Sequence, residues 1–387
     1  MKYVQTSAEL QEAISALDRH PRLAVDTEAD SLHRYSESLC LVQVSSPDDD
    51  YVIDPLAPLD LNPLARLLEK KEIVYHGADF DMRMLGRFYG YRAGKIFDTM
   101  IAAQLLGYTS QSLAALVERH FGVVLAKANQ KADWSRRPLT ESMIVYAAND
   151  THYLEGLARI MQRELEDLDR LEWFRESCEY VVEAVKVPRE TDTENRFRIK
   201  GSGDMSGKEL VLLRAVWQWR EKEAQRRDRP GFKVLNNDYM LDIVKWKIMH
   251  PQETLDRMPK LPSQLDAGRC CAVDEALTEA MALSPDTLPA VKRGDGPRRL
   301  TPEERDRVVT LKNERAQLAQ ELKCDPGILA PNATLETIIA KGARTLQDYR
   351  DLKCLKNWQA ELIAARFQHA LEEAAAKPPS EDPPAVC

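Results

Sequence analysis

The sequence predicts an α/β domain followed by two all-helical domains. Within the first 160 residues, three short strand patterns are joined by brief turns, and a fourth leads into a helix pattern. From about residue 205 to the end no convincing strand pattern occurs. A polar stretch rich in Pro and Gly, at 284–299, divides this helical half into two similar pieces. With 387 residues, the chain is long enough for two or three domains that each bury a core.

The α/β part opens with an amphipathic helix pattern at 1–22, whose interspersed acidic residues distinguish it from a signal peptide. The strand patterns are RLAVDTEA at 22–29, CLVQVSS at 40–46, DYVIDP at 50–55 and EIVYHG at 72–77. The short turns between the first three predict an antiparallel meander. Helix patterns follow at 80–90, 98–108, 112–122 and 140–165, and Asp98 and Thr140 are placed to cap two of them.

The two helical pieces look like a duplicated module. The first has Arg220, Ala224 and Pro230-Gly231, and the second has Arg315, Ala319 and Pro326-Gly327 at the same intervals to within one residue. The predicted units are an α/β domain over 1–170, a helical linker over 171–204, a first helical domain over 205–285, a linker over 286–299, a second helical domain over 300–373 and a disordered tail over 374–387.

Composition narrows the class of protein. Hydrophobic residues make up 44% and charged residues 30%, as in ordinary water-soluble proteins, and no run reaches the length that spans a bilayer. We therefore expect a cytoplasmic protein. Seven scattered cysteines without C-x-x-C spacing fit reduced thiols better than a zinc or redox site. The net charge of −8 gives no overall attraction to nucleic acid, although local patches can provide it.

The first strand pattern carries two carboxylates where burial should be deepest. Side chains two apart on a strand point to the same face, so Asp26 and Glu28 project together. Unpaired and partly buried, two like charges would cost several kcal/mol or force one group to stay protonated. The patch therefore needs an Arg or Lys partner or a metal, unless the strand ends there and both carboxylates lie in water.

Two later segments carry further candidates. After the strand pattern that ends at His76, either Asp79 or Asp81 could cap the next helix, and capping is the simplest role for Asp79. Tyr146 and Asp150 are one helical turn apart and share a helix face.

The order of these residues is informative. D-x-E on a first strand, an Asp after a later strand and Y-x-x-x-D on a helix resemble the DEDD exonuclease superfamily in its tyrosine-containing branch, which has a ribonuclease-H-like fold. Within it, the chain is most similar to the ribonuclease D family. HGADFDMRML at 76–85 looks like that family's second motif and selects Asp81 over Asp79, and the segments 97–108 and 130–154 are also similar. The helical modules resemble HRDC domains, so the resemblance covers nearly the whole chain.

The resemblance implies a hydrolase that removes nucleotides from RNA 3′ ends, releases nucleoside 5′-monophosphates and acts in tRNA 3′ maturation. Its catalytic set would be Asp26, Glu28, Asp81, Tyr146 and Asp150, with the four carboxylates as ligands of two divalent ions, Mg²⁺ or Mn²⁺. Asp26 would bridge the ions, Glu28 and Asp150 would complete one site, Asp81 would act through bound water, and Tyr146 would hold or help deprotonate the attacking water.

The expected partner is RNA with a free 3′ end, in particular tRNA precursors. No membrane association is expected, and the sequence does not indicate a protein partner. Two alternatives stay open. A DNA 3′→5′ exonuclease fits the same carboxylates, because they do not distinguish the sugar. An RNA-binding adaptor with an idle active site is disfavoured by the intact set of five residues.

Several neighbouring residues have two interpretations. Trp134, Arg136 and Arg137 could stack a base and contact phosphate, or could be a core Trp with solvated Arg side chains. His76 is expected to be structural, and His152 is a less favoured alternative base.

The first helical module carries a cationic run at 220–233. It is either a solvated surface or an RNA-phosphate patch, and at least one of Trp217 and Trp219 should be core because they cannot share a helix face.

Overall fold

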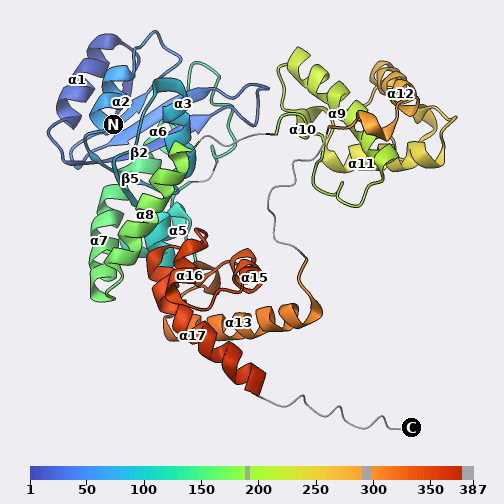
Figure 1. Cartoon of the computed structure of the whole chain (residues 1–387). Coiled ribbons are helices and arrows are strands. Elements are labelled where there is room, and N and C mark those ends of the chain that lie inside the picture. The colour runs from blue at the N-terminus through green and yellow to red at the C-terminus, as the bar shows by residue number, and fades with distance from the viewer. Residues whose placement is uncertain (127, 188–191, 290–298, 377–387) are drawn as a thin grey trace.

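The computed structural model describes residues 1–126, 128–187, 192–289 and 299–376. An α/β domain comes first and two helical modules follow it, so the predicted fold class is confirmed (Figure 1).

One six-stranded sheet, in the order β1-β4-β3-β2-β5-β6, forms the centre of the α/β domain. Its strands are β1 (Lys2–Val4), β2 (Arg22–Ala29), β3 (Leu39–Ser45), β4 (Asp50–Ile53), β5 (Glu72–Tyr75) and β6 (Lys95–Asp98). Strands β2, β3 and β4 pair antiparallel, as the predicted meander requires, whereas β5 runs parallel to β2. The sequence patterns missed the two edge strands: β1 lies inside the helix pattern at 1–22, and β6 ends at Asp98, where the helix pattern at 98–108 begins.

Helices surround the sheet. They are α1 (Ser7–Leu17), α2 (Asn62–Leu68), α3 (Asp79–Tyr89), α4 (Thr99–Leu105), α5 (Leu113–Phe121), α6 (Glu141–His152), α7 (Leu154–Asp167) and α8 (Leu171–Lys186). The pattern at 140–165 predicts one helix, but the chain forms two that meet at Tyr153. The break lets α6 pack on β2, β3 and β4 while α7 contacts α4 and β5.

Helix α8 corrects the prediction of a helical linker over 171–204. Its Phe174, Cys178 and Val182 are buried in the same core as the sheet, and α8 contacts α3, α4 and β6. The apolar spacing of this helix therefore serves the α/β domain, and only the residues after Lys186 can connect it to the first module.

The helical modules begin with the same three elements. In the first module they are α9 (Gly207–Arg226), α10 (Gly231–Val234) and α11 (Asn237–Met249), followed by η1 (Leu255–Arg257), α12 (Ala267–Met281) and η2 (Pro285–Thr287). In the second module they are α13 (Pro302–Glu321), α14 (Pro326–Leu329) and α15 (Asn332–Lys341), followed by α16 (Leu346–Asp351) and α17 (Asn357–Ala376).

Two arginines at equivalent places support the interpretation as a repeat. Arg220 of α9 donates to the carbonyl of Leu235 and to Asn237 Oδ1, at 3.4 and 2.9 Å. Arg315 of α13 donates to Ala330 and Asn332, which lie at the same separations of 15 and 17 residues along the chain. Each arginine therefore joins the first helix of its module to the start of the third.

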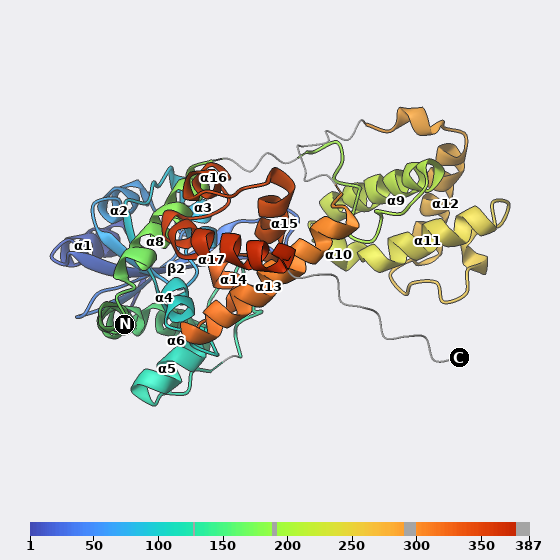
Figure 2. The ribbon, with the colours of Figure 1, turned by 60° about the horizontal axis from the view of Figure 1, so that its bottom comes forward.

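The second module packs directly on the α/β domain (Figure 2). Its apolar side chains belong to the same buried cluster as the sheet, and Trp358 stacks on Trp173 of α8 with ring centroids 4.8 Å apart. The buried Arg170 donates to the carbonyls of Leu105 and Leu322, both at 2.5 Å, and so bridges the two units.

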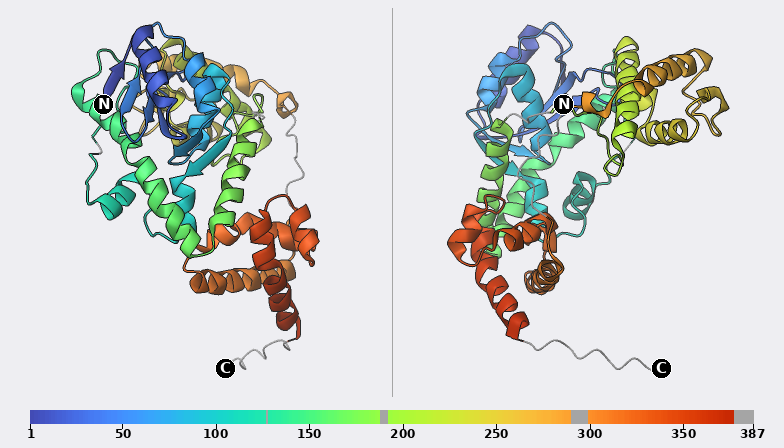
Figure 3. Two further views of the ribbon diagram at one scale, coloured as in Figure 1. Left: turned by 90° about the vertical axis from the view of Figure 1, so that its left-hand side faces the viewer. Right: turned by 45° about the vertical axis from the view of Figure 1, so that its right-hand side comes forward.

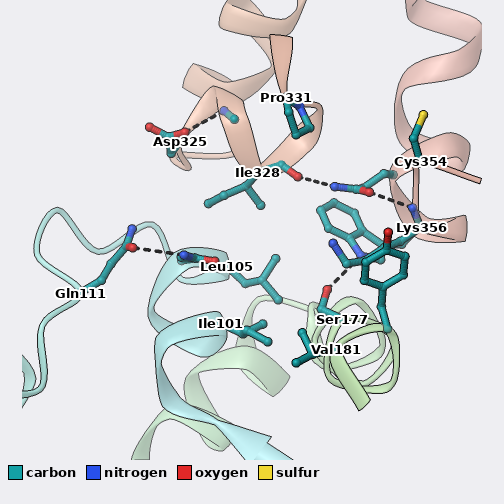
Figure 4. A pocket seen from close by; sticks show the side chains of 15 residues that line it. Ile101, Leu105, Gln111, Ser177, Val181, Asp325, Ile328, Pro331, Cys354 and Lys356 are labelled. Atoms are coloured by element: carbon teal, nitrogen blue, oxygen red, sulfur yellow. Dashed lines mark hydrogen bonds between the residues drawn. The ribbon is translucent and has the colours of Figure 1, made fainter. Parts of the chain in front are cut away.

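A cavity of about 650 Å³ remains within this interface. Figure 4 shows Ile101, Leu105 and Val181 of the α/β domain facing Ile328 and Pro331 of the second module across it. Apolar side chains thus line both sides of the contact.

The first module has a core of its own and lies on another side of the α/β domain (Figure 3). It meets the segment between β2 and β3 through polar groups: Arg34 pairs with Asp228 at 3.0 Å, and Asp228 also accepts from the Tyr35 backbone N–H at 3.1 Å.

The second linker and the C-terminal tail lie only partly within the described residues. Most of the predicted linker over 286–299 lies outside the described residues, as do residues 377–387 of the predicted tail. Residues 374–376 of that tail are the last turn of α17. In the described part of the chain, no helix has the length and apolarity to cross a membrane. The six cysteines described there are unpaired, as expected for reduced thiols.

Candidate active site

Strand β2 presents Asp26 and Glu28 to helix α6. Glu28 is the cross-strand neighbour of Leu41, and Leu41 packs with Ala147 and Ala148 of α6. Because cross-strand neighbours and residues two apart share a face, both carboxylates point toward α6. The alternative in which they lie at a solvated strand end is wrong, since both are partly buried and lie with Asp150 of α6.

Helix α6 supplies the next two residues. Thr140 caps it, as predicted, by accepting from the Met143 N–H at 3.3 Å. Tyr146 and Asp150 lie one turn apart on the same side of this helix. One carboxylate oxygen from each of Asp26, Glu28 and Asp150 lies within 4.8 Å of the others, an arrangement that could hold a metal ion.

Asp81 stands beside this trio rather than within it. It is 5% exposed and accepts a 2.5 Å hydrogen bond from the hydroxyl of Thr27, which points to the opposite face of β2 from its two acidic neighbours. Asp79 does not cap α3, contrary to the simplest expectation. It instead pairs with Arg83 at 3.0 Å, one turn along the helix.

Asp98 fixes the turn from which α3 begins. It caps α4, as predicted, by accepting from the Met100 N–H at 2.9 Å. It also accepts from the N–H groups of Gly77 and Ala78, at 3.0 and 2.8 Å. One buried carboxylate therefore holds two turns and sets the position of Asp81.

The carboxylates face a cleft of about 420 Å³. Neither Lys nor Arg lies among the described residues that line it. Burial, together with the charge of Asp150, raises the pKa of Asp26 well above its usual range. Burial and the three neighbouring carboxylates raise the pKa of Glu28 to about 10, and burial and Asp81 raise that of Asp150 to about 7. These shifts have one electrostatic cause: several acids lie together, and the described residues that line the cleft include no cation to compensate them.

Tyr146 lies in the same cleft, within hydrogen-bonding reach of Asp150. Burial and the nearby carboxylates raise the pKa of its phenol well above the usual value, so the hydroxyl keeps its proton. Trp134 packs against Tyr146 with ring centroids 6.0 Å apart and is only 1% exposed. The prediction that Trp134 stacks a base is therefore wrong, and its ring supports Tyr146 instead.

Arg137 is also a structural residue. Its guanidinium donates to both oxygens of Asp54, at 2.6 and 2.7 Å, and to the carbonyls of Cys40 and Trp134. All of its groups are engaged within the protein, which corrects the prediction of a phosphate contact. Arg136 is different, because its side chain is 80% exposed and pairs only with Asp133 among the described residues.

The two histidines have separate surroundings. His76 lines the cleft, and its Nδ1 lies 3.0 Å from Thr99 Oγ1, which itself donates to the Tyr75 carbonyl. His76 Nδ1 must therefore carry the proton of that contact, and burial lowers the pKa of the ring. His152 Nδ1 pairs with Asp50 at 2.9 Å and does not line the cleft.

Only part of the cationic run of the first module is exposed to solvent. Arg220 is 7% exposed and makes the contacts with Leu235 and Asn237 described above, and Arg226 pairs with Glu223 at 2.8 Å. Trp217 and Trp219 are both partly buried against the module's core.

Sequence reasoning missed several cleft residues. Ser112, Leu113 and Gln130 line the cleft from the segments around α5, and Thr27 holds Asp81. Ser112 is recognisable in the sequence as a helix cap, but its place in the cleft depends on how α5 packs. Gln130 has no local signal.

Comparisons with known proteins agree with this geometry. A family model described as 3′-5′ exonuclease matches residues 1–166, and an HRDC domain model matches 209–261. Ribonuclease D of Gluconacetobacter diazotrophicus is 30% identical over 362 residues, covering 92% of this chain and 89% of that protein. Ribonuclease D of Nitrobacter hamburgensis is 30% identical over 372 residues, covering 94% and 93%.

Two crystal structures share the fold along nearly the whole length. The RNase D of Escherichia coli has a TM-score of 0.69 at 22% identity, with 96% of this chain and 98% of that chain covered. A protein from Bifidobacterium adolescentis has a TM-score of 0.79 at 23% identity, with 96% and 97% covered.

The sheet order, the acidic cleft and the match over the first domain define a 3′→5′ exonuclease. The chain belongs to the ribonuclease D family, which confirms the resemblance found in the sequence. It is thus a hydrolase that acts as a 3′→5′ exoribonuclease.

Proposed function

We propose that this protein trims the 3′ ends of tRNA precursors by metal-dependent hydrolysis and releases nucleoside 5′-monophosphates. The observation that carries the proposal is the trio Asp26, Glu28 and Asp150, whose oxygens approach within 4.8 Å although each carboxyl is strongly desolvated. Such a trio is stable as carboxylates only beside a cation. The tRNA substrate rests on membership of the ribonuclease D family.

The donor atoms fit two hard divalent cations, Mg²⁺ or Mn²⁺. Ligands in the cleft are carboxylate oxygens, and no Cys lines it among the described residues. Asp26 would be a ligand of both ions, and Glu28 and Asp150 would complete the ligand set of one ion. When bound, the ions would supply the charge that stabilises the leaving oxygen and makes water acidic enough to attack phosphorus.

The other side chains would position the reactants. Asp81, held by Thr27, points beside the trio, so we propose that it acts through a bound water. Tyr146 keeps its proton and can donate, so its hydroxyl would orient the attacking water. His76 commits Nδ1 to Thr99, which leaves Nε2 for a contact with the RNA end.

The test compares a 3′-labelled tRNA precursor with a DNA strand of the same sequence, in Mg²⁺, in Mn²⁺ and in EDTA. We expect labelled 5′-mononucleotides from the RNA in either metal and none in EDTA. Full activity in EDTA would contradict the metal requirement. Equal rates on DNA would favour the alternative of a general 3′→5′ exonuclease.

A matched pair of variants tests the choice of ligands on α3. Asp81→Asn should lower the rate by several orders of magnitude, whereas Asp79→Asn should retain most of it, because Asp79 pairs with Arg83. The reverse order would assign the site to Asp79. Melting temperatures of both variants show whether a loss of activity comes from unfolding.

A further inference from the structure

A second groove, with basic walls, runs between α3 and α8. It has a volume of about 810 Å³, larger than the acidic cleft. Its lining includes the cations Arg83, Arg87, Arg92 and Lys186 above a floor that contains Met82 and Val182. We refer to it as the α3–α8 groove.

Of these four cations, three have an acidic partner and one has none among the described residues. The guanidinium of Arg92 has no hydrogen-bond or ion-pair partner within the described parts of the chain, and Arg87 faces Glu37 at 3.7 Å with 57% of its side chain exposed. Lys186 pairs with Glu183, but both side chains are largely in water, where such a pair contributes little. Only Arg83 is fully engaged, with Asp79 and the Ala184 carbonyl.

A basic groove is unusual in this chain, whose net charge is −8. Cations concentrated on one surface of an acidic protein give a local attraction for a polyanion that the overall charge does not. An aromatic side chain accompanies them, since the Arg87 guanidinium lies over the ring of Phe88 at 5.2 Å and that ring is 40% exposed. Arginine beside an exposed ring is the combination that contacts a phosphate and stacks a base in single-stranded RNA.

The groove leads away from the acidic cleft along one helix. Met82 of its floor directly follows Asp81, and Arg87 lies six residues after Asp81, a rise of about 9 Å along α3. Glu37, from the segment between β2 and β3, also lines the groove and lies 3.7 Å from Arg87. The first turn of α3 therefore carries Asp81, beside the acidic trio, and its later turns line the groove.

We propose that the α3–α8 groove binds the phosphate backbone of the RNA on the 5′ side of the nucleotide being removed. This rests on the exoribonuclease activity and extends it: the acidic cleft takes the last nucleotide, while the groove distinguishes a long strand from a short one. Glu37 is the only carboxylate among the groove-lining residues, and its negative charge would repel the RNA phosphates.

The experiment measures binding of 5′-fluorescent oligoadenylates of twelve and three nucleotides to the full chain in EDTA, over a range of salt concentrations. Arg87→Ala/Arg92→Ala should weaken binding of the longer strand about tenfold and reduce the slope of log affinity against log salt by about 1.4, as expected for two lost phosphate contacts. Glu37→Gln should tighten binding.

The control is Arg159→Ala/Arg175→Ala, which also removes two arginines, each more than half exposed and each paired with a Glu on its own helix. It should leave affinity and salt slope unchanged. Equal losses in both double variants, or parental affinity in the groove variant, would overturn the proposal. So would competition by polyglutamate as strong as that by RNA, which would make the groove a protein-docking surface.

Binding in EDTA needs no turnover, so its outcome stands apart from the metal-dependent trimming proposed above. If the parent cleaves no RNA but the groove variant still loses affinity, the proposed function fails and the groove assignment holds.

Discussion

Replacing Asp150 with Asn should stabilise the metal-free protein while abolishing its activity. Asp150 is partly buried, and desolvation together with the charge of Asp81 raises its pKa from 3.8 to about 7. Because the folded protein holds this proton more tightly than the unfolded chain, ionisation costs stability. The cost is absent below pH about 4, grows as the pH rises and is complete above about 7.

The expected change in the free energy of unfolding follows from the pKa of Asp150. A rise in this pKa from 3.8 to about 7 corresponds to a destabilisation on the order of 4 kcal/mol at pH 8. Asn still has to be desolvated, so we expect about half of this as a net gain, roughly 2 kcal/mol. For a domain of this size such a gain raises the melting temperature by about 4–8 °C.

The assay is thermal unfolding of parent and variant at pH 4.5 and pH 8, in EDTA and in Mg²⁺. In EDTA the variant should melt higher at pH 8 and nearly equal to the parent at pH 4.5. Mg²⁺ should raise the melting temperature of the parent more than that of the variant, because a ligand of the folded state stabilises by mass action. A gain of the same size at both pH values, or a variant less stable at pH 8, would refute the electrostatic reasoning.

Three further perturbations test individual residues. Tyr146→Phe should lower the rate by about 10²–10⁴-fold while metal and RNA bind nearly normally, and a parental rate would make the tyrosine a packing residue. Arg137→Ala leaves Asp54 buried without its partner, so the melting temperature should fall by the equivalent of about 3–5 kcal/mol; a selective loss of RNA affinity instead would restore the substrate-binding interpretation. Gly107→Ala would put a Cβ 1.8 Å from the Lys323 carbonyl oxygen at a φ of +75°, so proteolysis should cut between the α/β domain and the second module more readily; unchanged cleavage would contradict the tight docking.

The sequence predicted those elements whose signals are local. Strand β2 has the predicted bounds, and Asp98 and Thr140 cap helices as expected. The edge strands β1 and β6 adjoin helix patterns that mask them in the sequence, and each pairs with one neighbouring strand, β4 or β5. The role of α8 is equally non-local, since an amphipathic pattern does not say which core the apolar face joins.

The site shows the same division. Asp26, Glu28 and Asp150 could be grouped from their order along the chain, and they lie together. Trp134 and Arg137 could not be understood in this way, because their roles come from distant partners: Leu41 belongs to the cluster that buries the indole, and Asp54 is 83 residues from the arginine it binds. A tryptophan beside two arginines has the same local pattern whether it faces solvent or core.

The two helical modules are attached to the α/β domain in two unlike ways. The second copy shares the domain's own core, so separating it would expose a large apolar surface to water. The first copy has a separate core and is held in part by the exposed pair Arg34–Asp228, an interaction that costs little to break. We therefore expect the second module to keep a fixed position on the α/β domain and the first module to change its position. The enzyme could then accommodate RNAs of different size without disturbing its acidic cluster.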